Sequence, residues 1–192
     1  MNREIYATDG EYTLCPITKE DIKYYYPDAY SMIDDEDLPY MSNILWKRLM
    51  TEGNRVYLIF DDNSEYCGSI ELQHPDDDTP EIGIDLLKNK RNKGIATKVV
   101  KLLARKAYEE KAVEYYLIRI HSKNSHSRHV FEKMGAVLIG DECTFYDRFI
   151  SSLKDEGESE LLEYIQKRFD NSSDGEKSVV YRYKLTPDIF NK

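Results

Sequence analysis

The stretch from Glu81 to Ala107 restricts the fold of this chain more than any other. It begins with the strand-like run EIGIDLL, continues through a turn rich in lysine and arginine, and ends in TKVVKLLARKA. After Gly94, Ile95, Val99 and Leu103 recur at helical spacing, with lysines and arginines largely between them. A strand, a basic turn and an amphipathic helix in succession predict a domain in which helices pack on a sheet.

The turn between this strand and this helix is a candidate anion site. The first N–H groups of a helix have no partner inside the helix, and its aligned peptide dipoles leave partial positive charge there. Gly94 lets a ligand approach the backbone closely, while Arg91 and Lys93 add full charges. On the turn alone, a solvated basic loop is an equal alternative, because the turn matches neither GxGxxG nor GxxxxGK[ST].

The composition is that of a globular protein. A chain of 192 residues forms one domain or at most two small ones. Its 41% hydrophobic and 12% aromatic residues argue against disorder. The sequence has neither the roughly 20 successive apolar residues of a membrane span nor a signal-peptide run at its N-terminus. We therefore predict a cytoplasmic protein without a membrane partner.

Cysteine, histidine and charge patterns exclude other classes of site. The three cysteines, Cys15, Cys67 and Cys143, are odd in number and far apart, which predicts reduced thiols. The histidines form no paired ligand pattern, so no metal is expected. The formal net charge of -9 disfavours nucleic-acid binding. The acidic runs 34–37 and 76–78 either attract a cationic substrate or are solvated loops.

The remaining pattern predicts one α/β (α+β) domain over residues 1–192. The first half is expected to form a strand at Tyr12–Ile17, a helix capped by Thr18, a loop or broken helix at Tyr24–Tyr40 and a helix at Ser42–Met50. A meander of strands then follows at Arg55–Asp61, Tyr66–Gln73 and Pro80–Leu87. After the helix that begins at Gly94, we expect a strand at Tyr115–His121, a helix at about Ser125–Lys133, a strand at 136–140 and a last strand at Ser178–Leu185. The Tyr115–His121 strand should lie parallel to the strand before the crossover helix. Residues 148–177 are predicted to be a helical insertion.

Two motifs on these elements resemble the GNAT superfamily of N-acetyltransferases, which use acetyl-CoA. The first, Arg91-Asn92-Lys93-Gly94-Ile95-Ala96, matches the family's pyrophosphate-binding pattern of Arg or Gln, two residues, Gly, one residue, then Gly or Ala. The second runs from Asn124 through Ser127 to Phe131-Glu132-Lys133-Met134-Gly135-Ala136. The element order extends the resemblance over about residues 11–146 and 178–185. It implies a mixed, mostly antiparallel sheet with a parallel, splayed strand pair.

The resemblance also implies roles for particular residues. Backbone amides from Lys93 to Thr97 would hold the coenzyme A pyrophosphate, and the main chain of the preceding strand would pair with pantetheine. Asn124 would contact the cofactor, or it is an ordinary helix-cap asparagine. The candidate cofactor-binding residues are Ile84, Asp85, Leu86, Arg91, Asn92, Lys93, Gly94, Ile95, Ala96, Thr97, Asn124 and Phe131.

Acetyl transfer needs a neutral amine, so a base is expected. Glu81 starts the strand where similar enzymes often carry a base, and burial there would raise its pKa; an exposed strand-end glutamate is an equal alternative. Phe131 stands where many family members have the tyrosine that protonates the leaving thiolate, and it is better interpreted as packing. Ser127, Tyr146 or water could supply that proton, or no acid is needed.

The resemblance therefore predicts an N-acetyltransferase that moves an acetyl group from acetyl-CoA to a primary amine of a small cationic molecule or peptide. A polyamine or aminosugar would suit the acids and tyrosines of Tyr24–Tyr40 and 148–177, and the Ser-Arg-x-x-Phe-Glu-Lys spelling also resembles the branch that acetylates ribosomal-protein N-termini. The alternatives are a catalytically weak acyl-CoA-binding sensor of the same fold, and an interaction domain whose basic turn is only surface. A monomer or homodimer is expected.

Overall fold

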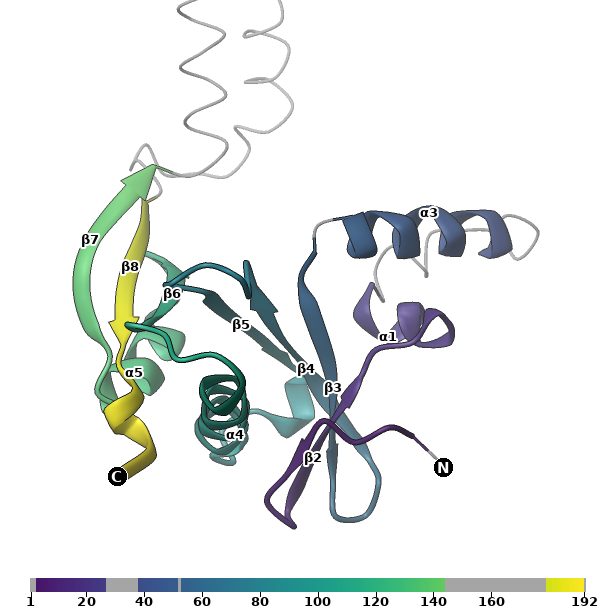
Figure 1. Ribbon diagram of the computed structural model, residues 1–192, viewed down its shortest axis with the longest axis horizontal. Helices are drawn as coiled ribbons and strands as arrows, with labels where there is room; N and C mark the ends of the chain where they lie inside the picture. The colour runs from purple at the N-terminus through teal and green to yellow at the C-terminus, as the bar shows by residue number, and fades with distance from the viewer. Residues whose placement is uncertain (1–2, 27–37, 52, 144–178, 192) are drawn as a thin grey trace, which may run out of the picture.

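The computed structural model describes residues 3–26, 38–51, 53–143 and 179–191 (Figure 1). Within these ranges the chain forms one eight-stranded sheet, in the order β1-β2-β3-β4-β5-β6-β8-β7. The strands are β1 (Ala7–Thr8), β2 (Tyr12–Pro16), β3 (Arg55–Asp61), β4 (Tyr66–Gln73), β5 (Glu81–Leu86), β6 (Tyr116–His121), β7 (Val137–Cys143) and β8 (Val179–Leu185). All neighbours are antiparallel except β5 and β6, as predicted.

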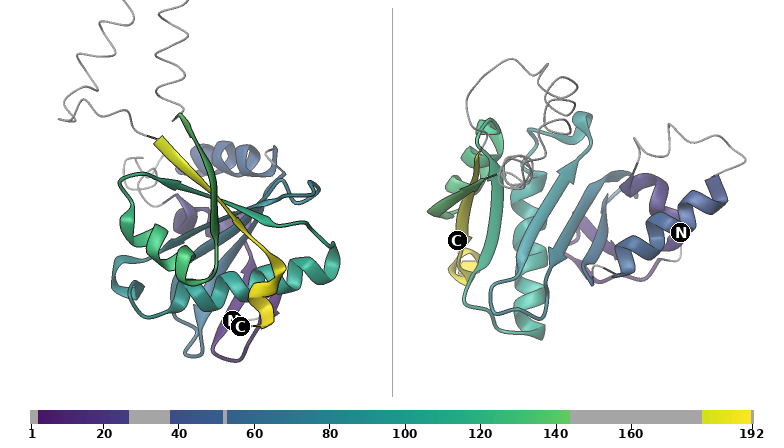
Figure 2. Two further views of the ribbon diagram at one scale, coloured as in Figure 1. Left: turned by 90° about the vertical axis from the view of Figure 1, so that its left-hand side faces the viewer. Right: turned by 90° about the horizontal axis from the view of Figure 1, so that it is seen from above.

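Helices cover both faces of this sheet (Figures 1 and 2). On one face, α4 (Ile95–Glu110) buries a stripe that includes Val99, Val100 and Leu103 in the larger core cluster. On the other face, α1 (Ile22–Tyr25) and α3 (Leu38–Thr51) pack on β3 around Ile22, Leu49 and Leu58. The alternation of β3 explains both contacts, because successive side chains of a strand point to opposite faces.

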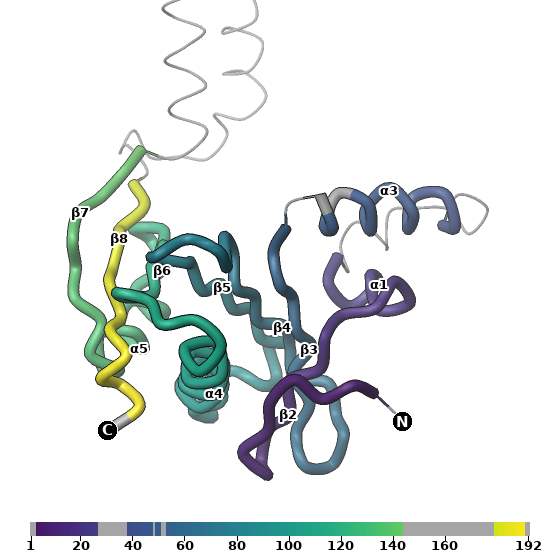
Figure 3. The backbone as a smooth tube through the Cα atoms, viewed as in Figure 1, coloured from purple at the N-terminus to yellow at the C-terminus, as the bar shows by residue number. Residues whose placement is uncertain are grey.

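The parallel pair is short, and this opens the sheet in its middle. Its recorded register is the single pair Glu81↔Leu117, beside a hydrogen bond from Leu117 N to the Pro80 carbonyl oxygen at 2.9 Å. Beyond that point β5 and β6 diverge, while β5 stays paired with β4 through Leu86. The buried hydroxyl of Tyr116 donates to the Ala104 carbonyl at 2.7 Å and holds α4 on β6. Figure 3 follows the backbone through this gap.

The predicted bounds are accurate for the strands of the β3–β4 hairpin and for α5 (Ser125–Lys133). The turn chemistry of the hairpin and the cap of α5 were the signals. Other predictions were shifted or incomplete. The helix predicted at Ser42 begins at Leu38, with Pro39 in its first turn, so the expected loop ends earlier. The two-residue strand β1 was not predicted, and the helix after Thr18 starts with a 3₁₀ turn, Lys19–Asp21. Residues 148–177 lie outside the described ranges.

A buried carboxylate attaches the N-terminal segment to this frame. Asp21, only 2% exposed, accepts hydrogen bonds from Arg3 Nη1 and Nη2, both at 2.7 Å. It also accepts from the backbone N and the hydroxyl of Thr18, at 3.0 and 2.8 Å. Burial alone would raise the pKa of Asp21, but the hydrogen bonds from Arg3 and Thr18 outweigh it and lower the pKa.

We predict that Asp21→Asn lowers the free energy of unfolding by about 2 kcal/mol at neutral pH, because it leaves Arg3 without its charge partner. The stabilisation from a lowered carboxyl pKa is complete above the unfolded value of about 4 and is lost as the pH falls through the folded value. Urea unfolding at several pH values measures both effects. Asp188→Asn, at an exposed position, is the matched control and should unfold like the wild type.

Candidate functional site

The basic turn is fixed to the sheet by one of its lysines. The 3₁₀ turn Lys88–Lys90 follows β5, and Lys90 Nζ donates to Asp61 Oδ2 at 2.9 Å and to Glu65 Oε2 at 2.6 Å. Both acceptors belong to the β3–β4 hairpin. Hydrogen bonds from Lys90 to these carboxylates raise the pKa of its ammonium group. Lys90 therefore positions the turn, and the charge available to a ligand comes from other residues.

Arg91 links the turn to the end of β5. Its Nε donates to the Leu86 carbonyl at 2.8 Å, and its Nη2 donates to Asp85 Oδ1 at 3.1 Å. Asn92 and Gly94 then have φ values of 62° and 78°, so both residues adopt left-handed backbone conformations in the turn before α4 begins. A Cβ built on Gly94 would meet no atom within 4 Å, which means that the space in front of this helix end is open.

A cavity of about 430 Å³ lies in front of this helix end. Every candidate cofactor-binding residue lines it except Lys93. Ser127, a member of the second motif and a candidate proton donor, also lines it, as do His126 and Val130, to which the sequence motifs give no role. These three residues lie on α5. Ser127 is three residues after Asn124 and four before Phe131, and Val130 is three residues after Ser127 and four after His126, so helical spacing was the signal that could have grouped them.

Asn124 combines the two roles considered for it. Its Oδ1 accepts a hydrogen bond from Ser127 N at 3.0 Å, so it is the N-cap of α5, and it also lines the cavity. Because this hydrogen bond uses the amide oxygen, the Nδ2 group of Asn124 is the part of the side chain that can donate to a ligand. Phe131 is 3% exposed and belongs to the core cluster, in agreement with a packing role.

The gap between β5 and β6 leaves part of the β5 edge without a strand partner in the described structure. The peptide groups of a strand alternate between its two edges. Leu87 N bonds to Cys67 O on β4, whereas Pro80 O bonds to β6, so the peptide groups of Ile84 and Leu86 face the gap. The Leu86 carbonyl accepts from Arg91, while Ile84 lies beyond the last recorded β5–β6 pair. This edge can pair with an extended ligand.

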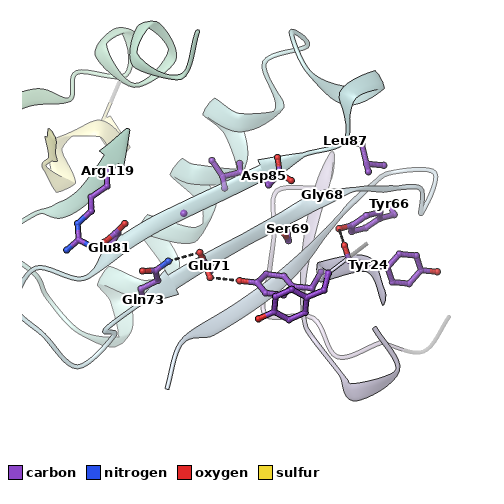
Figure 4. Close-up of a pocket in the computed structure, with 14 residues that line it drawn as sticks. Tyr24, Tyr66, Gly68, Ser69, Glu71, Gln73, Glu81, Asp85, Leu87 and Arg119 are labelled. Carbon is purple, nitrogen blue, oxygen red and sulfur yellow. Dashed lines mark hydrogen bonds and ion pairs between the residues drawn. The ribbon is translucent and has the colours of Figure 1, made fainter. Parts of the chain in front are cut away.

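A second cavity, of about 480 Å³, lies on the other side of β5 (Figure 4). It shares Ile84 and Asp85 with the first cavity, so β5 separates two spaces that meet along its length. Tyr24, Tyr25, Tyr26 and Tyr66 contribute aromatic walls, and Glu71 and Glu81 contribute carboxylates. A space of this kind suits a cation with an apolar body.

Glu81 is buried at the edge of this second cavity. It is 9% exposed, which excludes the alternative of an exposed strand-end glutamate. Arg119 Nη1 lies 3.3 Å from Glu81 Oε2, while Arg119 Nε lies 3.4 Å from Glu142 Oε1. Oε2 has no hydrogen-bond donor among the described residues, so Arg119 supplies charge without good hydrogen-bond geometry. Burial raises the pKa of Glu81, and Arg119 opposes this in part.

Glu71 is a site residue that the sequence analysis did not find. Its Oε2 accepts from the Tyr25 hydroxyl at 2.7 Å, and its Oε1 accepts from Gln73 Nε2 at 2.6 Å (Figure 4). The register pairs Glu71 with Gly83 and Gln73 with Glu81, so these side chains share one face of the sheet. The period-two alternation of β4 could have identified this face.

The two side chains predicted as possible proton donors to the thiolate have different outcomes. Ser127 lines the first cavity, whereas Tyr146 lies outside the described residues. Within the described ranges, no group of three or more His, Cys, Asp and Glu residues could hold a metal ion, and no helix is long and apolar enough to cross a membrane.

Comparison with known proteins provides independent information on the fold and family. A family model described as acetyltransferase (GNAT) domain matches residues 6–137. Among solved structures, the dodecameric spermidine N-acetyltransferase from Vibrio cholerae has a TM-score of 0.65 at 14% identity, covering 94% of this chain and 96% of that one. The same enzyme in complex with CoA and spermine has a TM-score of 0.64 at 14% identity, covering 96% and 100%. No curated protein sequence matches.

We predict that Glu81→Gln changes how stability depends on pH. A carboxyl group whose folded pKa is raised destabilises the fold once it ionises, so the wild type should lose stability as the pH rises above the unfolded value of about 4.3. The glutamine variant lacks this loss, and its stability relative to the wild type should increase with pH. Urea unfolding between about pH 4 and 8 tests this. A difference that stays constant, or that moves in favour of the wild type, would show that the pair with Arg119 outweighs burial.

Proposed function

The chain belongs to the GNAT acetyltransferase family, and on this basis we propose that it transfers the acetyl group of acetyl-CoA to a primary amine of a small cationic molecule or a peptide. The observation that carries this proposal is the pair of cavities that meet on β5. One cavity lies at a helix N-terminus beside a basic turn, and the other has carboxylates and phenol rings. These are suitable surroundings for a phosphate-bearing donor and a cationic acceptor respectively.

The residues of the first cavity fit coenzyme A. The N–H groups of Ile95, Ala96 and Thr97 open α4 and point toward the space in front of Gly94, where a pyrophosphate would accept their hydrogen bonds. Arg91 lines the same space and adds positive charge. The free peptide groups of β5 would pair with the amides of pantetheine, which places the thioester near Ile84, where the two cavities meet.

Glu81 would act as the base. Its carboxylate, directly or through a water molecule, takes a proton from the acceptor ammonium or from the attacking amine. The amine nitrogen then forms a bond to the thioester carbonyl carbon and loses its remaining excess proton to water, and the carbon–sulfur bond breaks. The leaving thiolate accepts a proton from water, and no dedicated acid is required because a thiolate is a good leaving group. An N–H of β5 in the gap would stabilise the negative charge that develops on the carbonyl oxygen.

The similar structures support a cationic acceptor. The Vibrio cholerae enzyme is described as a spermidine N-acetyltransferase and has been solved with CoA and spermine, and its identity to this chain is 14%. For the present chain, polyamines, aminosugars and peptide amines all remain within the proposed class. A monomeric or homodimeric state of this chain stays a prediction. The similar Vibrio cholerae structure is described as dodecameric. A cytoplasmic location and the absence of a nucleic-acid partner also stay predictions.

Acetyl-CoA binding and amine-dependent release of free thiol test the proposal together. We expect acetyl-CoA to raise the melting temperature, and at least one amine of a panel of polyamines, aminosugars and peptides to release thiol and gain an acetyl group by mass spectrometry. A raised melting temperature without acetylation of any amine would favour the sensor alternative. The absence of any thermal shift would contradict the cofactor assignment.

We further predict that Gly94→Glu weakens acetyl-CoA binding at least about tenfold by calorimetry, because it places a carboxylate at the pyrophosphate position. Gly53→Glu is the matched control. Gly53 also has a positive φ, 68°, and open space around its Cβ position, but it follows α3 and lies away from the cavity. Both variants carry the same backbone strain of about 1 to 2 kcal/mol, so equal losses of binding would indicate destabilisation rather than a lost contact.

A further inference from the structure

The face of the sheet below the second cavity has three carboxylates, Glu71, Glu81 and Asp85. Asp85 is paired with Arg91 at 3.1 Å, and the other two lie in different surroundings. Glu71 and Glu81 lie on neighbouring strands as diagonal neighbours, because Glu71 pairs with Gly83 and Glu81 pairs with Gln73. Diagonal Cβ atoms on one face of a sheet are about 7 to 8 Å apart. Two cationic groups on one flexible molecule can therefore approach both carboxylates at once.

Gly83 makes room for the carboxylate of Glu71. A Cβ added at Gly83 would lie 2.6 Å from Glu71 Oε1 and 3.0 Å from its Cγ, so the glutamate side chain lies across β5 at this point. Tyr25 and Gln73 hold it there by donating to one oxygen each. Both donors are neutral, so the negative charge of an ionised Glu71 has hydrogen-bond partners and no cationic partner among the described residues.

Glu81 differs from Glu71 in each of these respects. It is buried, its charge is partly met by Arg119, and its Oε2 has no hydrogen-bond donor in the described structure. Within the described structure, the Glu71 carboxylate is thus held in place without a counter-ion, while the Glu81 carboxylate is buried and has one oxygen without a donor. Because of this difference, we expect each carboxylate to interact with a different amino group of the acceptor.

We infer that Glu71 binds a second cationic group of the acceptor while Glu81 serves the amine that reacts, so that the preferred acceptor carries at least two amino groups. This inference rests on the proposed acetyltransferase function and makes its acceptor class narrower. The phenol rings of Tyr24 and Tyr66 have centroids 5.0 Å apart and planes tilted by 42°. They form a wall of the same cavity and would contact the alkyl chain or an ammonium group. Glu71 is then a specificity-determining residue that the motifs do not include.

A purely structural role for Glu71 is the alternative, because its bond to Tyr25 also connects α1 to the sheet. The two roles differ in what they change. A structural role would lower activity with every acceptor alike, whereas a cation-binding role affects only acceptors that carry a second charge. The two roles can be distinguished with a set of acceptors of similar chain length that carry either one amino group or more than one.

The test compares spermidine and putrescine with butylamine as acceptors, at saturating acetyl-CoA, in the wild type and in Glu71→Gln. We expect the wild type to prefer spermidine and putrescine, and the variant to raise their KM about 10- to 100-fold, the range for one charged hydrogen bond. The KM for butylamine should change less than about twofold. Gly83→Ala should also raise the KM for spermidine and putrescine, because the added methyl group displaces the Glu71 carboxylate while its charge remains.

Glu109→Gln, at an exposed position on α4 outside both cavities, is the control for a general loss of negative charge and should leave each KM unchanged. Equal use of butylamine and putrescine by the wild type would overturn the inference. So would a uniform loss of kcat with all three amines in Glu71→Gln, which would make Glu71 structural or the base itself. Binding of acetyl-CoA without acetylation of any of these amines would count against the transferase proposal for amines of this class, and this inference would fail with it.

Discussion

The short pairing between β5 and β6 is the constraint on which the rest of the structure depends. Beyond Glu81↔Leu117 the two parallel strands separate, and the peptide groups of Ile84 and Leu86 face the gap instead of a neighbouring strand. Both residues are half-buried and line the first cavity, so these peptide groups are available to pair with a ligand there, apart from the Leu86 carbonyl, which accepts from Arg91. The gap also brings both cavities to the same strand.

Charge is distributed around this strand in a way that the overall composition conceals. The chain has a formal net charge of -9, yet the turn after β5 is basic and stands at a helix N-terminus. The opposite cavity has Glu71, Glu81 and Asp85 on neighbouring positions of one face. An anionic donor and a cationic acceptor would each find the opposite charge on its own side of β5, which separates them until they meet near Ile84.

Local signals predicted much of the fold and part of the candidate site. The DDNSE turn defined the β3–β4 hairpin, and the crossover helix correctly predicted that β5 and β6 are parallel. The positions around the first cavity follow from short-range spacing in the turn and in α5. By contrast, the charge environment of Glu81 involves Arg119 and, through it, Glu142, which come from strands far away in the sequence. The placement of Glu71 over Gly83 depends on the register between β4 and β5. Neither follows from spacing along the chain.

Amide hydrogen exchange on β5 tests the central claim most directly, because the strand contains its own control. The Ile84 and Leu86 amides face the gap, while those of Gly83 and Asp85 alternate with them and face β4. We predict that saturating acetyl-CoA slows exchange at Ile84, Leu86 and the first turn of α4, with little change at Gly83 and Asp85. Unchanged exchange at Ile84 and Leu86 with acetyl-CoA bound would contradict it.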